Sequence, residues 1–193
     1  ELERLGILFR RICQKAARTP LTMKKPFNLM KWIEEHQDEF KKPVMNKQFY
    51  KEADDVIVFV SLGPNTRNDY HVNPTEELFY QLKGDIAVRI RPLDGSPPHD
   101  VVIREGEMYL LPRHVPHRPQ RPDNTIGLIV EFPRPKGTVD KLVWYCPDDI
   151  HLVHEAEFRL EHIDEEPANR LAFLLGVGNP LKRAEEGLAR IPM

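Results

Sequence analysis

His71 and Glu77 are the first two residues of this chain whose types and spacing could bind a metal ion. They lie six residues apart, and the basic residue Arg67 precedes the histidine by four residues. A neutral imidazole and a carboxylate together suit a divalent first-row metal such as iron, manganese or nickel. Two protein ligands would hold such an ion only loosely, so the chain should supply a third ligand.

Two candidates for that third ligand follow a second glycine-containing segment. Gly106 opens a turn, a short apolar run leads to Pro112, and His114 and His117 come directly after it. Both imidazoles therefore lie beyond the end of a predicted strand. Taken singly, a histidine in such a place is more often structural than metal-binding, and the residues alone leave the choice between the two open.

A similar choice exists between Glu76 and Glu77. Neighbouring residues of a strand point to opposite faces, so only one of these carboxylates can face the interior. Glu77 shares its face with Phe79 and Gln81, whereas Glu76 shares the other face with Leu78.

The spacings of the two segments resemble the two motifs of the cupin superfamily. That resemblance selects Glu77 rather than Glu76, and His117 rather than His114. It implies a ligand set of His71, Glu77 and His117. The two motifs read His71-x5-Glu77-x6-Gly84 and Gly106-x5-Pro112-x4-His117.

One position departs from the usual cupin pattern in an informative way. Many cupins have a further histidine ligand where this chain has Asn73. The remaining set of two histidines and one carboxylate leaves three adjacent coordination positions open. An iron(II) oxygenase needs this arrangement to hold its substrate and dioxygen side by side.

Three longer segments, 63–71, 76–84 and 110–122, resemble the 3-hydroxyanthranilate 3,4-dioxygenase family. The resemblance covers most of the chain and implies a non-haem dioxygenase with Fe(II) as its cofactor. Such an enzyme opens the aromatic ring of 3-hydroxyanthranilate with O2 to give 2-amino-3-carboxymuconate semialdehyde. That product leads to quinolinate and to NAD biosynthesis from tryptophan through the kynurenine pathway.

The same resemblance implies roles for residues beyond the three iron ligands. Arg67 is expected to lie beside bound dioxygen. Arg121 and Glu131, together with Glu77, are expected to bind the substrate. Arg67 and Glu131 are the two residues expected to take part in catalysis.

The chemistry of these side chains is consistent with those roles. Arg121 lies four residues after His117, and a guanidinium can grip a carboxylate through two parallel hydrogen bonds. Glu131 lies in the apolar run 127–132, where a buried carboxylate is costly unless it is partnered or functional. The residues alone favour the interpretation of Glu131 as a strand-end residue that faces water.

Short strands must position these side chains, because short apolar runs alternate with turn residues throughout the middle of the chain. This pattern favours an antiparallel sandwich or barrel. With the motifs, it predicts a mainly β fold, a cupin (jelly-roll, double-stranded β-helix) barrel with a few short flanking helices. A helix is predicted over Asn28–Phe40, with Asn28 as its N-cap. The predicted strands are 56–61, 77–82, 86–90, 101–103, 108–111, 125–132 and 141–145, with 152–162 as a further candidate.

The catalytic domain is expected to cover residues 26–163. Residues 1–25 are basic and partly apolar, and they form either a targeting helix or a helical or disordered extension. Glu1 and Glu3 weigh against targeting, since such peptides avoid acidic residues. The tail 164–193 diverges from the family and includes a candidate helix at 169–175.

The composition of the chain indicates which classes of partner and which cellular compartment to expect. A chain of 193 residues fits one domain, and its net charge of −2 gives no reason to expect nucleic acid or a membrane surface as partner. Two cysteines, Cys13 and Cys146, are too few for a disulfide framework and fit a reducing compartment such as the cytoplasm. The resemblance to cupins, whose sheets often pair edge to edge, implies a homodimer.

Some members of the resembled family carry a second metal site built from two Cys-x-x-Cys pairs. Here Cys146 lacks its partner and no second pair follows, so a four-thiolate site cannot form within this chain. Two alternative functions remain open, a cupin enzyme for a different substrate and a non-catalytic cupin that binds metal. A non-catalytic protein could lose ligands freely, yet all three are retained.

Overall fold

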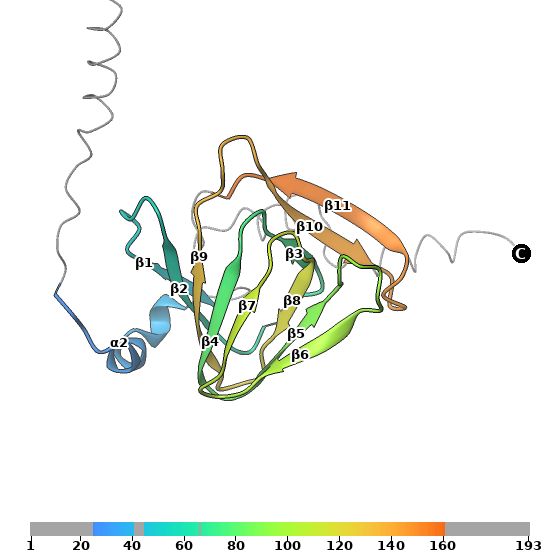
Figure 1. Cartoon of the computed structure of the whole chain (residues 1–193). Helices are drawn as coiled ribbons and strands as arrows, with labels where there is room; N and C mark the ends of the chain where they lie inside the picture. Colours follow the sequence, from blue (N-terminus) through green and yellow to red (C-terminus); the bar gives the residue numbers. More distant parts are fainter. Residues whose placement is uncertain (1–24, 41–44, 66, 161–193) are drawn as a thin grey trace, which may run out of the picture.

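The computed structural model describes residues 25–40, 45–65 and 67–160, and this part of the chain forms two antiparallel sheets that face each other (Figure 1). The first sheet has the order β1-β2-β9-β4-β7, with β1 (Asn46–Phe49), β2 (Ile57–Leu62), β9 (Ile126–Glu131), β4 (Glu77–Lys83) and β7 (Met108–Leu111). The second has the order β11-β10-β3-β8-β5-β6, with β11 (Leu152–Phe158), β10 (Asp140–Tyr145), β3 (Tyr70–Val72), β8 (His117–Gln120), β5 (Ile86–Ile90) and β6 (His99–Ile103).

The chain passes repeatedly from one sheet to the other, as in a jelly-roll, and this confirms the predicted cupin fold class. The predicted strands are present, most of them within two residues of their predicted ends, and the candidate at 152–162 is strand β11. Three further strands, β1, β3 and β8, escaped prediction. Two of them are polar, β8 contains Pro119, and β3 is only three residues long, so none shows a clear period-two apolar pattern.

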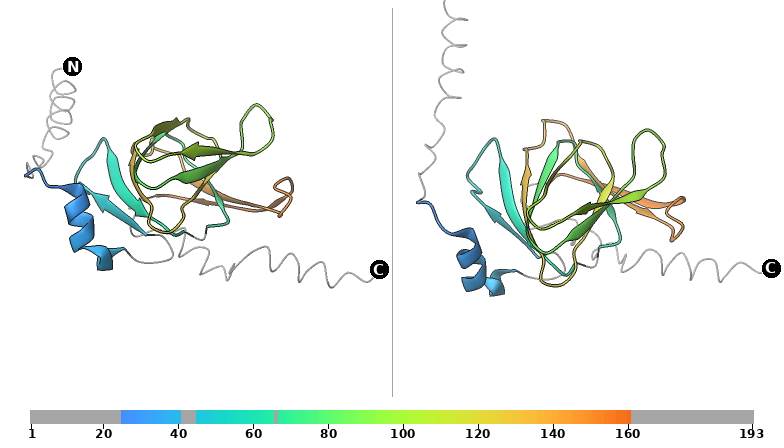
Figure 2. Two further views of the ribbon diagram at one scale, coloured as in Figure 1. Left: turned by 90° about the horizontal axis from the view of Figure 1, so that it is seen from below. Right: turned by 60° about the horizontal axis from the view of Figure 1, so that its bottom comes forward.

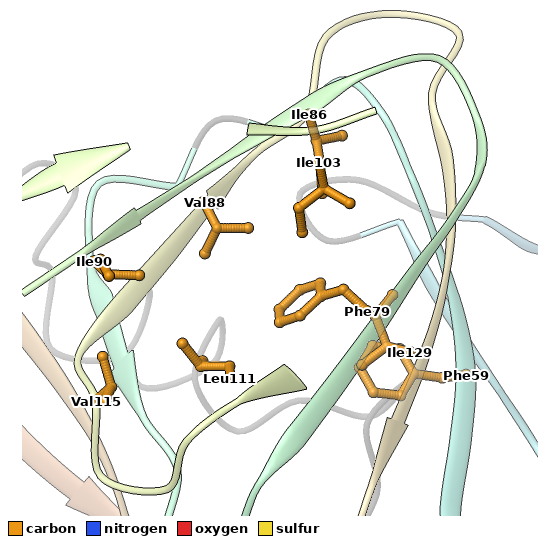
Figure 3. Packing of buried hydrophobic residues seen from close by; sticks show 9 residues of the cluster. All are labelled: Phe59, Phe79, Ile86, Val88, Ile90, Ile103, Leu111, Val115 and Ile129. Carbon is orange, nitrogen blue, oxygen red and sulfur yellow. The ribbon is translucent and has the colours of Figure 1, made fainter. Parts of the chain in front are cut away.

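The main core lies between the two sheets (Figure 3). Alternate residues of β4 are buried, and the same alternation occurs in β5, as expected for strands with one face toward the core. Each such large apolar side chain contributes roughly 1.5–3 kcal/mol by leaving water. The buried cluster consists of Phe59, Phe79, Ile86, Val88, Ile90, Ile103, Leu111, Val115 and Ile129.

The predicted helix is present but shorter than expected. Helix α2 covers Leu29–Glu35, and a 3-10 turn, η1, follows at Gln37–Glu39. Asn28 caps α2 as predicted, because its Oδ1 accepts a hydrogen bond from the Lys31 amide at 3.0 Å. The extension to Phe40 was wrong. The side chains of His36 and Gln37 bond the carbonyls of Trp32 and Ile33, both at 2.7 Å, and thereby compete with the amides that would continue the helix.

Helix α2 packs beside β1 and β2, on the side of the first sheet away from the second sheet (Figure 2). Ile33 is fully buried there against Val60, Leu62 and Ile126. None of the described helices has the length and apolar character that a membrane span requires. The predictions for residues 1–24 and for the tail beyond residue 160, including the helix at 169–175, lie outside the described residues.

The two motif glycines have a structural reason. Gly84 and Gly106 adopt φ values of +65° and +83°, a left-handed conformation that residues with a Cβ atom rarely adopt. Gly84 follows the end of β4, and Gly106 lies two residues before β7. These tight turns connect the strands that carry the metal-binding candidates to the rest of the barrel.

Candidate metal centre and anion pocket

Strand register brings the three predicted metal ligands together. His71 of β3 lies directly opposite His117 of β8, while Glu77 is the first residue of β4 in the facing sheet. One ligand atom from each of the three residues lies within 4.8 Å of the others. The group could therefore hold one metal ion.

The two alternatives that the residues alone left open lie elsewhere. Glu76 faces outward and pairs with Arg113 at 3.6 Å, with much of its side chain exposed. His114 is exposed and has a positive φ of 65°. Glu77, in contrast, is only 5% exposed, and it faces the interior together with Phe79 and Gln81, as predicted.

Glu77 has the buried and incompletely bonded carboxylate that is expected of a metal ligand. Its Oε2 lies 3.0 Å from Nε2 of His117, but the geometry of this contact is not that of a hydrogen bond, and the buried oxygen has no such partner among the described residues. A buried carboxylate oxygen without a partner costs free energy unless a cation binds there. Two imidazoles and a carboxylate match the donor set of a divalent iron site.

Each of the two histidines makes a hydrogen bond through one ring nitrogen, and this bond determines which nitrogen is left to bind the metal. Nδ1 of His117 donates to the Val115 carbonyl at 3.0 Å, which leaves Nε2 toward Glu77. Nε2 of His71 donates to Oδ2 of Asp140 at 2.7 Å, which leaves Nδ1 with its lone pair. Such bonds set the tautomer and orientation of metal-binding histidines.

Burial and neighbouring charges act on these groups in opposite directions. Burial opposes the charge on Glu77, but His117 outweighs it and holds the pKa of Glu77 below its ordinary value. Burial lowers the pKa of His71, and Asp140 offsets only part of that effect. The result favours an ionised carboxylate and a neutral His71, the forms in which both residues bind metal.

Asn73 stands where many cupins have a histidine, and its side chain stabilises a turn. Its Oδ1 accepts hydrogen bonds from the amide and the hydroxyl of Thr75 at 2.9 and 2.8 Å. The side chain is buried and is not part of the metal-binding group. The three-ligand interpretation therefore agrees with the local geometry.

One cavity is lined by all six residues that the sequence selected for the site. It has both charged walls and apolar walls, the latter including Phe59, Phe79 and Ile129. Such a lining suits a flat aromatic molecule with polar substituents. The six selected residues are Arg67, His71, Glu77, His117, Arg121 and Glu131.

Arg121 is a buried cation without an ion-pair partner among the described residues. It is 4% exposed, and its Nη1 donates a hydrogen bond to Oε1 of Gln81 at 3.3 Å. The guanidinium lies over Gly127, where an added Cβ would come within 2.6 Å of Nη1. Burial lowers the pKa of Arg121 to about 10, and the charge of Glu77 offsets part of that effect. A guanidinium in this state favours an anionic ligand.

Glu131 is a buried carboxylate that titrates in the neutral range. Burial, followed by the charge of Glu77, raises the pKa of Glu131 to about 7. Nη1 of Arg134 donates to its Oε2 at 2.6 Å and opposes this effect. The interpretation of Glu131 as a strand-end residue that faces water is wrong, because its exposed fraction is only 2%.

Arg67 lies at the cavity wall and is held by a neighbouring acid. Its Nη2 and Nε donate to Asp69 at 2.5 to 3.3 Å. Burial raises the pKa of Asp69, but the Arg67 cation outweighs it and lowers the pKa below its ordinary value. The aspartate thus orients the cation beside the candidate metal group.

Three site residues escaped the sequence analysis, namely Asp69, Arg134 and Asp140. Asp140 begins the apolar strand β10, so the argument applied to Glu131, that a carboxylate in an apolar strand needs a partner, would have identified it. Arg134 stands between two prolines in a loop and gives no periodic signal. Only the fold shows that its side chain bridges the carboxylates of Glu131 and Asp140.

Comparison with known proteins gives a consistent result. The family model described as 3-hydroxyanthranilic acid dioxygenase matches residues 21–172. Proteins named 3-hydroxyanthranilate 3,4-dioxygenase are similar over most of the chain. The one from Brucella anthropi is 46% identical over 79% of this chain and 85% of its own length, and the one from Jannaschia sp. is 47% identical over 76% and 81%. The one from Neurospora crassa is 45% identical over 69% of this chain and 72% of its own length.

Proposed function

Because this chain belongs to the 3-hydroxyanthranilic acid dioxygenase family, it is an iron-dependent ring-cleaving dioxygenase, and we propose a role for each of its site residues on that premise. Its substrates are 3-hydroxyanthranilate and O2, and its product leads to quinolinate and NAD. The proposed iron ligands are His71, Glu77 and His117. Iron(II) bound there would pass electrons from the aromatic substrate to dioxygen and so make the two reactive toward each other.

The observation that carries the proposal is the position of Arg121. Its buried guanidinium lines the same cavity as the three ligands and has no carboxylate partner among the described residues. The substrate carries a carboxylate on the ring that is cleaved. Arg121 binds this carboxylate through two parallel hydrogen bonds and so places the ring against the apolar walls near Phe79.

Glu131 and Arg67 then act on protons and charge. The phenol O–H of the substrate must lose its proton before the oxygen can serve as an anionic donor to a metal, and Glu131 accepts that proton, since its pKa of about 7 suits a base near neutral pH. Arg67 stabilises the negative charge that develops on oxygen, which is worth about 3 kcal/mol for a well-aimed donor. Glu77 is an iron ligand and also lines the part of the pocket in which the substrate binds.

Glu131→Gln should lower kcat/KM by about 10²- to 10⁴-fold and flatten its acid limb. Below its pKa Glu131 is protonated and cannot accept a proton, so wild-type kcat/KM should fall as the pH drops through about 7. The positive charge of bound iron favours the ionised form of Glu131, so in the iron-loaded enzyme this acid limb should lie at a lower pH than about 7. The measurement is the pH profile of kcat/KM for the two proteins, with the outward-facing Glu76→Gln as control. A wild-type acid limb in Glu131→Gln would remove the assignment of Glu131 as base.

We also propose that two copies of the chain form a dimer. The edge strand β7 exposes Met108 and Leu110 by 64% and 57%, and a second copy would cover these apolar side chains. Light scattering after size-exclusion chromatography should give twice the mass of one chain. The mass of a single chain at micromolar concentration would contradict the dimer.

A cytoplasmic location and a catalytic domain over residues 26–163 complete the proposal. The free thiol of Cys146 is consistent with a reducing compartment. The family match over residues 21–172 supports a single catalytic unit in this part of the chain.

A further inference from the structure

A continuous chain of hydrogen bonds connects Glu131 and His71, which line the cavity, through two side chains that do not line it, Arg134 and Asp140. Arg134 donates from Nη1 to Oε2 of Glu131 at 2.6 Å. It also donates from Nη2 and Nε to the two carboxylate oxygens of Asp140 at 2.6 and 2.8 Å. Asp140 in turn accepts from Nε2 of His71 at 2.7 Å. One arginine thus links the carboxylate facing the substrate to the aspartate that holds a metal ligand.

The chain is buried, which makes each of its contacts costly to break. The side chains of Asp140, Glu131 and Arg134 are 0%, 3% and 8% exposed. Two buried carboxylates would repel each other without the cation between them, and a buried charge that loses its partner costs several kcal/mol. Burial opposes the charge of Arg134, but Asp140 and Glu131 outweigh it and raise the pKa of Arg134.

The fold explains how residues from separate elements meet here. Glu131 ends β9 and Asp140 begins β10, so Arg134 lies in the loop that connects these two strands. β9 belongs to the first sheet and β10 to the second, where Leu142 of β10 lies directly opposite His71 of β3. Nη1 of Arg134 also donates to the Phe132 carbonyl at 3.1 Å, a hydrogen bond within this loop.

We propose that Arg134 and Asp140 form a positioning pair that couples the metal site of this enzyme to its substrate site. Asp140 accepts a hydrogen bond from Nε2–H of His71 and thereby turns Nδ1 toward the metal site. Arg134 holds Asp140 in place with two of its nitrogens and holds Glu131 with the third. Neither residue touches the reacting atoms, so both act through the residues they hold. The inference rests on the proposed roles of His71 and Glu131.

Asp140→Asn tests the metal side of the coupling. An asparagine offers one acceptor oxygen in place of two, and its amide would face a donor from His71 or from Arg134. Iron affinity, measured without substrate by dialysis against a graded chelator, should fall by about 10- to 100-fold. Cobalt(II) bound in place of iron should show an altered visible spectrum, because the ligand field changes when His71 turns. The control is Lys141→Gln, the next residue of β10, whose ion pairs with Glu155 and Glu157 lie at the surface.

Arg134→Lys tests the coupling itself. Lysine keeps the positive charge, but its ammonium group cannot replace the planar fork that bonds Asp140 and Glu131 together. We expect the KM for 3-hydroxyanthranilate to rise and iron affinity to fall in this one variant, each by about tenfold. The matched control is Arg89→Lys, since Arg89 also bonds two aspartates, Asp149 and Asp100, and neither aspartate belongs to the site.

The possible outcomes distinguish a failure of the Arg134–Asp140 positioning pair from a failure of the proposed set of iron ligands. Iron binding by the wild type and its loss in His71→Ala test the ligand set alone. With that result in hand, iron affinity and KM within twofold of wild type in both variants would overturn the coupling. If Asp140→Asn does not fold, Arg134→Lys decides, and a raised KM with unchanged iron affinity would also overturn it. Thermal melting of the metal-free variants checks folding.

Discussion

Glu77→Ala is expected to abolish iron retention and to lower ring-cleaving activity by at least ~10³-fold, because a metal centre contributes several kcal/mol to such a reaction. Glu77 is the sole carboxylate in the three-residue group that the described residues offer to a metal ion. Its removal leaves two neutral imidazoles, and a divalent cation then loses the one ligand that neutralises part of its charge. Iron content after gel filtration and turnover under air are the two measurements.

Glu76→Ala is the matched control for this change. It removes a carboxylate from the neighbouring position, but Glu76 faces outward and pairs with Arg113. We expect iron content and turnover close to those of the wild type. Iron retained at one ion per chain in Glu77→Ala would contradict the proposed ligand set.

Arg121→Ala is expected to raise the KM for 3-hydroxyanthranilate by about 30- to 3,000-fold while iron content stays unchanged. Truncating one partner of a buried, hydrogen-bonded charge pair costs about 2–5 kcal/mol, and each 1.4 kcal/mol corresponds to about tenfold in affinity. Arg121 is not a ligand, so the metal should stay bound. Steady-state kinetics and iron analysis of the same preparation give both values.

The substrate analogue 2-aminophenol makes this prediction more specific, because it lacks only the carboxylate. Wild-type enzyme should bind it much more weakly than 3-hydroxyanthranilate, and Arg121→Ala should bind the two about equally. Arg118→Ala is the control, since Arg118 lies nearby on β8 and donates to the Asn68 carbonyl outside the cavity. A preserved preference for the carboxylate in Arg121→Ala would remove the assignment of Arg121.

The parts of the site that could be predicted from the sequence are those encoded within single segments. His71 and Glu77 are six residues apart, the period of two along β4 allows only one of two adjacent glutamates to face inward, and the motif spacing selects Glu77. Asn73 was informative for a similar local reason. Its replacement of a histidine predicts the open ligand set, and its hydrogen bonds to Thr75 agree with that interpretation.

The parts that could not be predicted depend on contacts between distant segments. Asp140 lies 69 residues from His71 along the chain, and only the pairing of β10 with β3 brings them together. The same holds for β3, which is only three residues long, and for β8, which is short and polar, because both become strands through the sheet that flanks them. The shortened helix α2 shows the opposite case, in which local side-chain bonds from His36 and Gln37 override a helical apolar pattern.

The central claim is that the cavity of this chain cleaves 3-hydroxyanthranilate with iron bound by His71, Glu77 and His117. The most direct test loads the protein with iron(II) without oxygen, adds 3-hydroxyanthranilate and then air, and follows absorbance near ~360 nm, where a conjugated ring-opened product of dioxygen chemistry at iron should absorb. We predict that this absorbance grows with each turnover and is absent from the Glu77→Ala protein. Iron-loaded wild-type protein that consumes neither oxygen nor 3-hydroxyanthranilate would contradict the claim.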